Sequence, residues 1–296
     1  MLRVATRGSQ LARWQADQVV AALGVPAEVS VVSTTGDRLE GVPVWEMGGT
    51  GVFVKEVSAA VLEGRADLAV HSAKDLPSAT WPGLVLAAVP ERGDPRDALV
   101  GAPLHALAPG SVVATGSVRR RAQLAWTRPD LTFTGLRGAI PTRLERVPTG
   151  GAAVVAHAAL QRLGRARDAA EVLDPSVLLP QVGQGALAVE CRADDEAVLE
   201  AVARIEDWPS RRAVDAERAF LACLGGGCDL PVGAWARPEG DDGGLRLDGL
   251  LASLDGLVLL RQSLVGDDPT ALGSALARQL LDECGGRALL EGVGPA

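Results

Sequence analysis

Tyrosine is absent from the sequence, and aromatic residues make up only 3% of its 296 residues. Proteins that bind single-stranded nucleic acids stack bases on aromatic side chains, and this composition offers few such platforms. The formal net charge of −8 also disfavours a polyanionic partner. We therefore expect no nucleic acid among the partners of the protein.

Long hydrophobic runs are missing as well. No apolar run approaches the roughly 20 residues that a membrane-spanning helix needs. The opening segment MLRVATRGSQLARWQ turns polar too soon for a secretory signal peptide. These features predict a cytoplasmic protein with no membrane partner.

Cysteine and histidine are scarce, with four and three residues respectively. Cys191, Cys223, Cys228 and Cys284 lack the pairing typical of zinc sites, so we predict no metal. Because a reducing compartment keeps thiols reduced, we also expect no disulfides. Lysine is scarcer still, because only Lys55 and Lys74 occur among 29 basic residues.

What is present is an ordinary globular composition, with 47% hydrophobic and 22% charged residues. The length favours two or three domains. Strand-like runs such as LRVAT, EVSVVST and ADLAVH alternate with helical patterns, the first of which follows Ser9 as a cap. A second alternating set begins at SVVAT, and the segment LVLAAVPERGDPRDALV between the two sets is interpreted as a linker.

The pattern changes beyond Pro209, where one helix precedes three short strands and a final helix over 270–283. The sequence therefore predicts two doubly wound α/β domains and a smaller α+β domain. The expected boundaries are 1–90 with 186–207 for the first domain, 91–185 for the second and 208–296 for the third.

Several predicted strand-to-helix junctions share arginine with serine, threonine or glycine. Such junctions lie at the carboxyl ends of strands, where helix N-termini attract anions. The forked side chain of arginine suits carboxylates, which favours a small polycarboxylate or phosphate as the ligand. A single arginine of this kind could instead point to solvent. The residues concerned are Arg7, Ser9, Thr115, Gly116, Ser117, Arg119, Arg120, Arg137, Gly138, Thr142 and Arg143.

Two loops carry further candidates. In HSAKDLP, Lys74 can bind an anion while Asp75 moves protons or stabilises a cation, although the segment could equally be a solvated turn. Cys228 follows three glycines, which leaves room for a bulky group at its sulfur. The segment Gly183–Ala188 fits a dinucleotide pattern in letters, but we discount it because a strand follows it.

Nine motifs occur in an order and spacing that closely resemble the porphobilinogen deaminase family, also called hydroxymethylbilane synthases. They run from near residue 3 to the last strands of the third domain. The motifs are ATRGS, GVFVKE, HSAKDLP, ERGDPRDALV, ATGSVRRRAQL, LRGAIPTRL, VGQGALAVECR, AERAFL and GGGCDLPVGA.

The resemblance implies a monomeric transferase of porphyrin and heme biosynthesis whose first two domains are like periplasmic binding proteins. The family joins four porphobilinogen molecules head to tail with loss of ammonia, and then releases hydroxymethylbilane by hydrolysis. The chain grows on a covalent dipyrromethane cofactor, whose thioether anchor matches Cys228.

The resemblance also implies roles for individual residues. Asp75 matches the catalytic aspartate. Positions that hold the cofactor match Lys74, Thr115, Ser117, Arg119 and Arg120, and positions that bind the substrate or the growing chain match Arg7, Ser9, Arg137, Arg143, Arg162 and Lys55. Three positions depart from the common pattern: Thr50 replaces lysine, Gly116 replaces serine and Ala139 replaces asparagine.

Two other functions stay open on the residues alone. A non-catalytic anion-binding receptor or effector with the binding-protein fold would explain the arginine-rich junctions, but it leaves Cys228 without a role. A cysteine-dependent transferase would need a base near Cys228, and no histidine lies close to it in the sequence.

Overall fold

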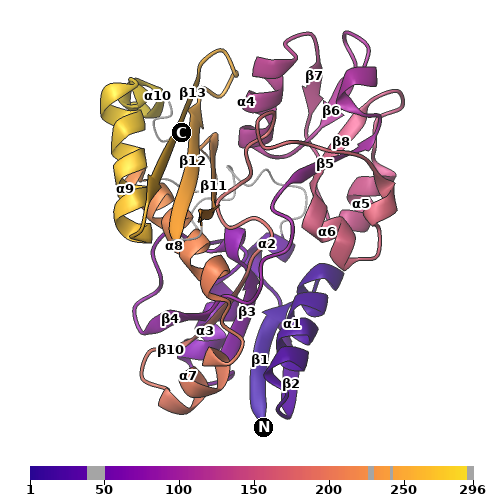
Figure 1. Ribbon diagram of the computed structural model, residues 1–296. Helices are drawn as coiled ribbons and strands as arrows, with labels where there is room; N and C mark the ends of the chain where they lie inside the picture. The colour runs from indigo at the N-terminus through magenta and orange to yellow at the C-terminus, as the bar shows by residue number, and fades with distance from the viewer. Residues whose placement is uncertain (39–50, 226–229, 241–242, 292–296) are drawn as a thin grey trace.

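The structure is a computed structural model that describes residues 1–38, 51–225, 230–240 and 243–291. Three sheets organise it. Figure 1 shows the N-terminal sheet at the bottom, a second sheet at the upper right, and the strands and helices of the C-terminal part at the upper left. The expected fold class is confirmed, because two α/β lobes precede a smaller α+β part.

The first sheet has the strand order β2-β1-β3-β10-β4. Strands β1, β2 and β3 run parallel, whereas β10 is antiparallel to both of its neighbours. Its elements are β1 (Leu2–Arg7), α1 (Gln10–Leu23), β2 (Ala27–Val32), α2 (Thr35–Arg38), α3 (Lys55–Leu62), β3 (Leu68–Ser72), η2 (Ala73–Asp75), β4 (Leu84–Ala88), β10 (Leu187–Arg192) and α7 (Glu196–Ala203).

The second sheet repeats this plan in the order β7-β6-β8-β5-β9, with β5 as its antiparallel strand. The similar patterns noted in the two sets of the sequence thus reflect the same topology. Its elements are β5 (Asp97–Gly101), η3 (Leu104–Ala106), β6 (Val112–Ala114), α4 (Val118–Thr127), β7 (Thr132–Thr134), α5 (Ile140–Glu145), β8 (Ala152–Ala156), α6 (His157–Arg162), η4 (Ala166–Asp168) and β9 (Ala169–Val172).

Two segments connect the lobes. Residues 89–96 lead from β4 to β5, and residues 173–186 lead from β9 back to β10. Each lobe therefore receives its antiparallel strand directly from the chain that crosses over. This arrangement brings the carboxyl ends of the parallel strands of both lobes toward a shared space.

The interpretation of 84–100 as a linker was wrong at both ends. The run LVLAA forms β4 and DALVG forms β5, so only 89–96 crosses between the sheets. Both runs are short and nearly continuous in apolar residues, and they lack the alternation that reveals a half-buried strand. β5 lies between β8 and β9 and is buried over Asp97–Val100, which explains the continuous pattern.

The third part is a three-stranded antiparallel sheet in the order β11-β12-β13, covered by α8 and α9. At the crossing of these helices, a Cβ on Gly273 would lie 2.3 Å from the carbonyl oxygen of Ala216, so a side chain there would push the helices apart. The elements are α8 (Trp208–Cys223), β11 (Val232–Glu239), β12 (Gly244–Ala252), β13 (Leu259–Gly266), α9 (Pro269–Arg278), η5 (Gln279–Glu283) and α10 (Gly286–Glu291).

Helix ends follow the sequence signals. Ser9 caps α1 by accepting a hydrogen bond from the N–H of Ala12, and Gly24 ends that helix with a φ of 63°. Among the described residues, none of the helices combines the length and the apolar character that a membrane crossing requires.

Candidate active site

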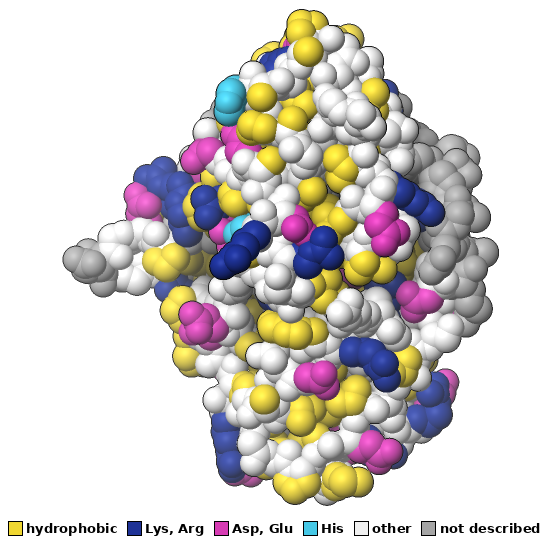
Figure 2. Space-filling view, turned by 90° about the vertical axis from the view of Figure 1, so that its right-hand side faces the viewer, with side chains coloured by type: hydrophobic (Ala, Val, Ile, Leu, Met, Phe, Trp, Pro, Cys, Tyr) yellow, Lys and Arg dark blue, Asp and Glu magenta, His cyan; other side chains and the backbone are white. Residues whose placement is uncertain are grey.

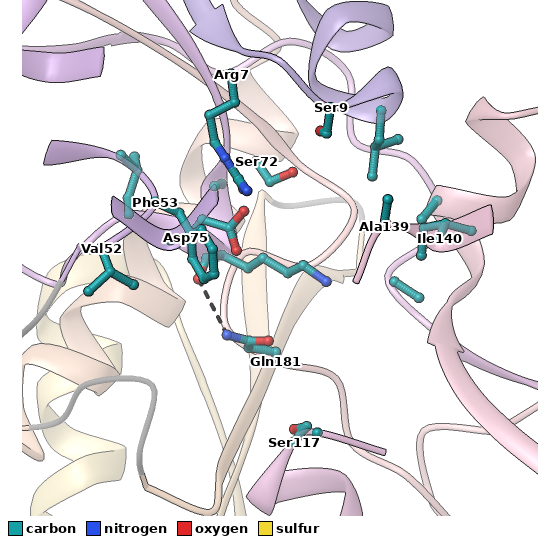
Figure 3. Close-up of a pocket in the computed structure, with 18 of the residues that line it drawn as sticks. Arg7, Ser9, Val52, Phe53, Ser72, Asp75, Ser117, Ala139, Ile140 and Gln181 are labelled. Carbon is teal, nitrogen blue, oxygen red and sulfur yellow. Dashed lines mark hydrogen bonds between the residues drawn. The ribbon is translucent and has the colours of Figure 1, made fainter. Parts of the chain in front are cut away.

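A cavity of about 640 Å³ lies where the three parts meet. The ends of β1 and β3 and the starts of α4 and α5 contribute to its wall, as the strand-to-helix junctions predicted. Figure 3 shows Arg7 and Asp75 on one side of the cavity and Ile140 on the opposite side. The predicted site residues on the wall are Arg7, Ser9, Lys74, Asp75, Ser117, Arg119, Arg120, Arg137 and Arg143.

Asp75 and Lys74 stand on η2, which directly follows the buried strand β3. The preceding Ser72 accepts a hydrogen bond of 2.8 Å from Nε2 of the buried Gln15 on α1. From the crossing segment, Gln181 donates a hydrogen bond of 3.3 Å to the carbonyl of Lys74, drawn as a dashed line in Figure 3. Contacts from two directions thus fix the backbone that carries the carboxylate of Asp75.

The amine of Lys74 is set apart by its surroundings. Burial lowers its pKa to about 8, and the nearby positive charge of Arg120 acts in the same direction. Its Nζ donates a hydrogen bond of 3.3 Å to Oε1 of Gln184. A carboxylate placed beside Lys74 would favour its charged form, so the site is suited to an acidic ligand.

Arg119 and Arg120 converge on one buried carboxylate. Arg119 Nη2 lies 2.7 Å from Oδ2 of Asp97, and Arg120 Nη2 lies 2.6 Å from its Oδ1. Burial alone would raise the pKa of Asp97, but the two guanidinium groups outweigh it and hold this pKa well below its usual range. The carboxylate therefore stays charged and fixes both arginines at the cavity wall.

The same cluster has an unused donor. Arg119 is 2% exposed, and within the described part of the chain its Nε has no hydrogen-bond partner. A buried donor without a partner is costly, and a ligand carboxylate would satisfy it. The residues present therefore fit a group that brings carboxylates into the cavity.

Two further arginines of the wall are held differently. Nε of Arg143 donates a hydrogen bond of 2.8 Å to the carbonyl of Gly138, and burial together with the charge of Arg120 lowers its pKa to about 10. Arg7 pairs with Asp37 and lies over the ring of Phe53, with its guanidinium carbon 4.4 Å from the ring centre. Both side chains remain at the wall of the cavity.

Three predicted site residues do not line the cavity. Thr115 is buried and accepts a hydrogen bond of 3.2 Å from the N–H of Ser117. Lys55 is the first residue of α3. Arg162 donates a hydrogen bond of 2.6 Å to the carbonyl of Gly185 and lies over the ring of Trp14, so it joins the two lobes. Cys228 and Thr50 lie outside the described residues, although Leu230 reaches the cavity wall.

The charge of the cavity contrasts with that of the whole chain. On the face shown in Figure 2, Lys and Arg side chains are interspersed with Asp and Glu side chains. The chain as a whole carries a formal net charge of −8. The predicted site residues nevertheless contribute five arginines and a lysine to the wall of this cavity. In the described part of the chain, no group of three or more His, Cys, Asp or Glu residues could hold a metal ion.

Two protein-family models match most of the chain. The family model "Porphobilinogen deaminase, dipyromethane cofactor binding domain" matches residues 2–200, and "Porphobilinogen deaminase, C-terminal domain" matches residues 212–282. The chain belongs to the porphobilinogen deaminase family. It is therefore an enzyme, a transferase, and the expected resemblance is confirmed.

Relatives and solved structures extend the comparison. Porphobilinogen deaminase of Roseiflexus sp. (strain RS-1) is 48% identical over 98% of this chain and 99% of its own, and that of Nitratidesulfovibrio vulgaris is 44% identical over 99% and 97%. A TRAP periplasmic solute binding protein from Desulfovibrio salexigens, with bound orotic acid, has a TM-score of 0.36 and 12% identity over 73% of this chain and 78% of its own.

Sequence reasoning missed Asp97 and Gln184 in this porphobilinogen deaminase family member. Asp97 opens a buried apolar strand, and a charge in such a position is a signal that it has a partner. Gln184 occurs in the discounted dinucleotide pattern and in the motif VGQGALAVECR, but neither gave it a role, and β10 does follow it as expected. In the structure Gln184 contacts both Lys74 and Asp97, so it connects the two lobes at the cavity.

Proposed function

We propose that this chain condenses four porphobilinogen molecules head to tail with loss of ammonia, on a covalent dipyrromethane, and then releases hydroxymethylbilane by hydrolysis. The observation that carries the proposal is the carboxylate of Asp75 beside Lys74 and near Arg7 and Arg143, at the wall of one cavity. A receptor would need the cationic groups but not this carboxylate among them.

Lys74, Ser117, Arg119 and Arg120 are proposed to hold the cofactor. When bound, the dipyrromethane supplies an electron-rich pyrrole carbon to which the next unit is added. The Nε of Arg119 supports the assignment, because within the described residues this buried donor has no hydrogen-bond partner. A carboxylate of the cofactor would give it one, whereas the Nε of a water-exposed arginine can donate to water. Thr115 acts through Ser117. Its hydroxyl oxygen accepts a hydrogen bond from the N–H of Ser117, and the hydroxyl of Ser117 caps α4.

Cys228 is proposed as the covalent anchor. The described residue Leu230 lines the cavity two positions after it, and Val232 lines it at the start of β11. Two residues of extended chain span at most about 7 Å, so an anchor at Cys228 stays within reach of the cavity.

Asp75 is proposed as the catalytic residue. Its carboxylate oxygens accept hydrogen bonds from the pyrrole N–H groups of the reacting porphobilinogen. They also offset the positive charge that develops on the pyrrole ring and its methylene carbon as the protonated amino group leaves as ammonia. The fixed backbone of η2 places these oxygens before the reaction begins.

Arg7, Ser9, Arg137 and Arg143 are proposed to bind the acetate and propionate groups of the substrate. All four line the cavity, and forked donors on both lobes suit a ligand that gains two carboxylates with each unit. Arg162 and Lys55 stay predictions from the resemblance, because neither lines the cavity.

We also propose a monomer that acts in the cytoplasm, with porphobilinogen as its partner and neither nucleic acid nor membrane. The acidic net charge supports this assignment. The proposed domains are 1–90 with 186–207, 91–185 and 208–296. Their support is that each sheet draws its strands from one of these three sets of residues.

The intact mass of the purified protein tests the proposal. We expect the wild-type chain to exceed its sequence mass by one dipyrromethane and Cys228→Ser to show no excess. Cys223→Ser is the matched control, because Cys223 ends α8 and should leave the extra mass in place. An unmodified wild-type chain that also fails to consume porphobilinogen would contradict the proposal and favour an anion-binding receptor.

A further inference from the structure

Strand β1 carries two arginines, and each pairs with an aspartate. Arg3 pairs with Asp67 at 2.5 Å, and this pair does not line the cavity. Arg7 pairs with Asp37, and both of these residues line the cavity. One of the groups proposed to receive a substrate carboxylate thus already holds a carboxylate of the protein.

The Arg7–Asp37 contact uses one whole edge of the guanidinium. Nε of Arg7 lies 3.2 Å from Oδ1 and 3.4 Å from Oδ2 of Asp37, and Nη2 also donates to Oδ1. This edge is the one that a ligand carboxylate would use for a two-point contact. Phe53 covers one face of the guanidinium and limits the ways in which Arg7 can turn to another partner.

Asp37 is itself held in place. Its Oδ2 accepts hydrogen bonds from the hydroxyl of Thr34 at 2.8 Å and from the N–H of Thr34 at 3.2 Å. Burial alone would raise the pKa of Asp37, but the hydrogen bonds from Arg7 and Thr34 outweigh it and keep this pKa below its usual range. Asp37 is therefore a charged and fixed partner when the substrate arrives.

We infer that Asp37 competes with a substrate carboxylate for the Nε–Nη2 edge of Arg7, and so limits how tightly each porphobilinogen unit is held. The inference rests on the proposed role of Arg7 in binding the substrate. It adds a role for Asp37, which lines the cavity together with Arg7.

Repeated addition gives such competition a purpose. The same arginine must bind a unit, release it as the chain grows, and bind the next one. Binding that is equally strong before and after reaction lowers KM without raising kcat, and it slows every release. A carboxylate that returns to Arg7 offsets the loss of each ligand contact, because the guanidinium is never left without a charged partner.

The test compares two conservative variants. Asp37→Asn keeps the shape but removes the charge, and we expect KM for porphobilinogen to fall about tenfold. We expect kcat to fall as well, and intact-mass spectra taken during turnover to show longer-lived enzyme species that carry additional pyrrole units. Asp67→Asn changes the equivalent pair of Arg3 outside the cavity and should leave all three quantities unchanged.

Arg7→Leu separates this inference from the proposed function. An unchanged KM in Arg7→Leu would contradict the substrate role of Arg7. A raised KM in Arg7→Leu, together with an unchanged or raised KM in Asp37→Asn, would overturn the inference that Asp37 competes with the substrate. It would leave the proposed substrate role of Arg7 in place. Should Asp37→Asn not fold, Thr34→Val loosens the Asp37 carboxylate by removing one hydrogen bond, and it should shift KM downward by a smaller factor.

Discussion

Arg92 and Glu217 form a two-point ion pair between the first crossing segment and α8, with Nη1–Oε1 at 2.6 Å and Nη2–Oε2 at 3.1 Å. Glu217 is fully buried and also accepts hydrogen bonds from the N–H groups of Gly183 at 2.7 Å and Ala236 at 2.8 Å. One carboxylate therefore holds together both crossing segments, the helix α8 and the strand β11.

Glu217→Gln should lower the free energy of unfolding by about 3–5 kcal/mol, because it leaves the buried charge of Arg92 without its partner. Denaturant-induced unfolding followed by tryptophan fluorescence measures this loss. Glu239→Gln is the control, since Glu239 pairs with Arg246 at the surface, where solvent screens the pair and its loss should change stability little. Similar losses in the two variants would show that Glu217 has no special structural role.

Local signals made much of the fold predictable from the sequence. Ser9 was expected to cap a helix and does so for α1, and the strand-like runs LRVAT and ADLAVH form β1 and β3. Where the structure differed, the local pattern was ambiguous. β4 and β5 are short apolar runs without polar alternation, and only their pairing with β10 and β8 distinguishes them from a linker.

The site was predictable as a set of residues but not as a set of contacts. The arginine-rich junctions do meet at one cavity. However, Asp97 precedes its partners Arg119 and Arg120 by more than 20 positions, and no local pattern connects them. The low pKa of Lys74 likewise depends on burial and on Arg120 from the other lobe, which only the assembled structure brings together.

Asp75→Ala should keep the fold and lose most of its turnover. Removal of a positioned group of this kind typically costs about 10²- to 10⁴-fold in rate. Steady-state consumption of porphobilinogen gives the rate, and circular dichroism checks the fold. Asp17→Ala removes an exposed carboxylate on α1 and serves as the control. Activity equal to that of the wild type in Asp75→Ala would refute the role assigned to this residue.

The amine of Lys74 should become reactive at an unusually low pH in Cys228→Ser, which lacks the proposed anchor for the cofactor. Below about pH 8 the side chain is a charged ammonium and does not react, whereas above it the neutral amine is a nucleophile. Mass spectrometry after limited acylation at a series of pH values should show half-maximal labelling of Lys74 near pH 8.

The wild-type chain supplies the comparison for Lys74. Cofactor carboxylates beside the amine favour the charged form, so labelling of the loaded enzyme should shift to higher pH. The lowered pKa of Lys74 also makes the stability of the folded chain depend on pH. Between about pH 8 and the ordinary value of 10.5 the unfolded chain holds a proton that the folded one has lost, so Lys74 makes stability rise with pH there. Labelling of Cys228→Ser with a midpoint near 10.5 would contradict the assigned environment.

Gly183 lies in the second crossing segment, where the chain passes beneath the loop that carries Asp75. Its φ is 70°, and a Cβ at this position would lie 3.0 Å from both the carbonyl carbon of Ala73 and the nitrogen of Lys74. Gly164 has a similar φ of 67°, but a Cβ there would meet nothing within 4 Å. The two glycines therefore differ in their neighbours and not in their backbone conformation.

Alanine substitutions at these two positions separate backbone strain from displacement. Both variants should lose about 1 kcal/mol of stability to the strained backbone. Only Gly183→Ala must also push the backbone of Ala73 and Lys74, and small misplacements of a catalytic group cost as much as about 100-fold in rate. We expect kcat to fall about 10- to 100-fold in Gly183→Ala and to be unchanged in Gly164→Ala. Equal kcat values would mean that the loop of Asp75 tolerates the added methyl group, and that the close approach of the crossing segment does not position the carboxylate.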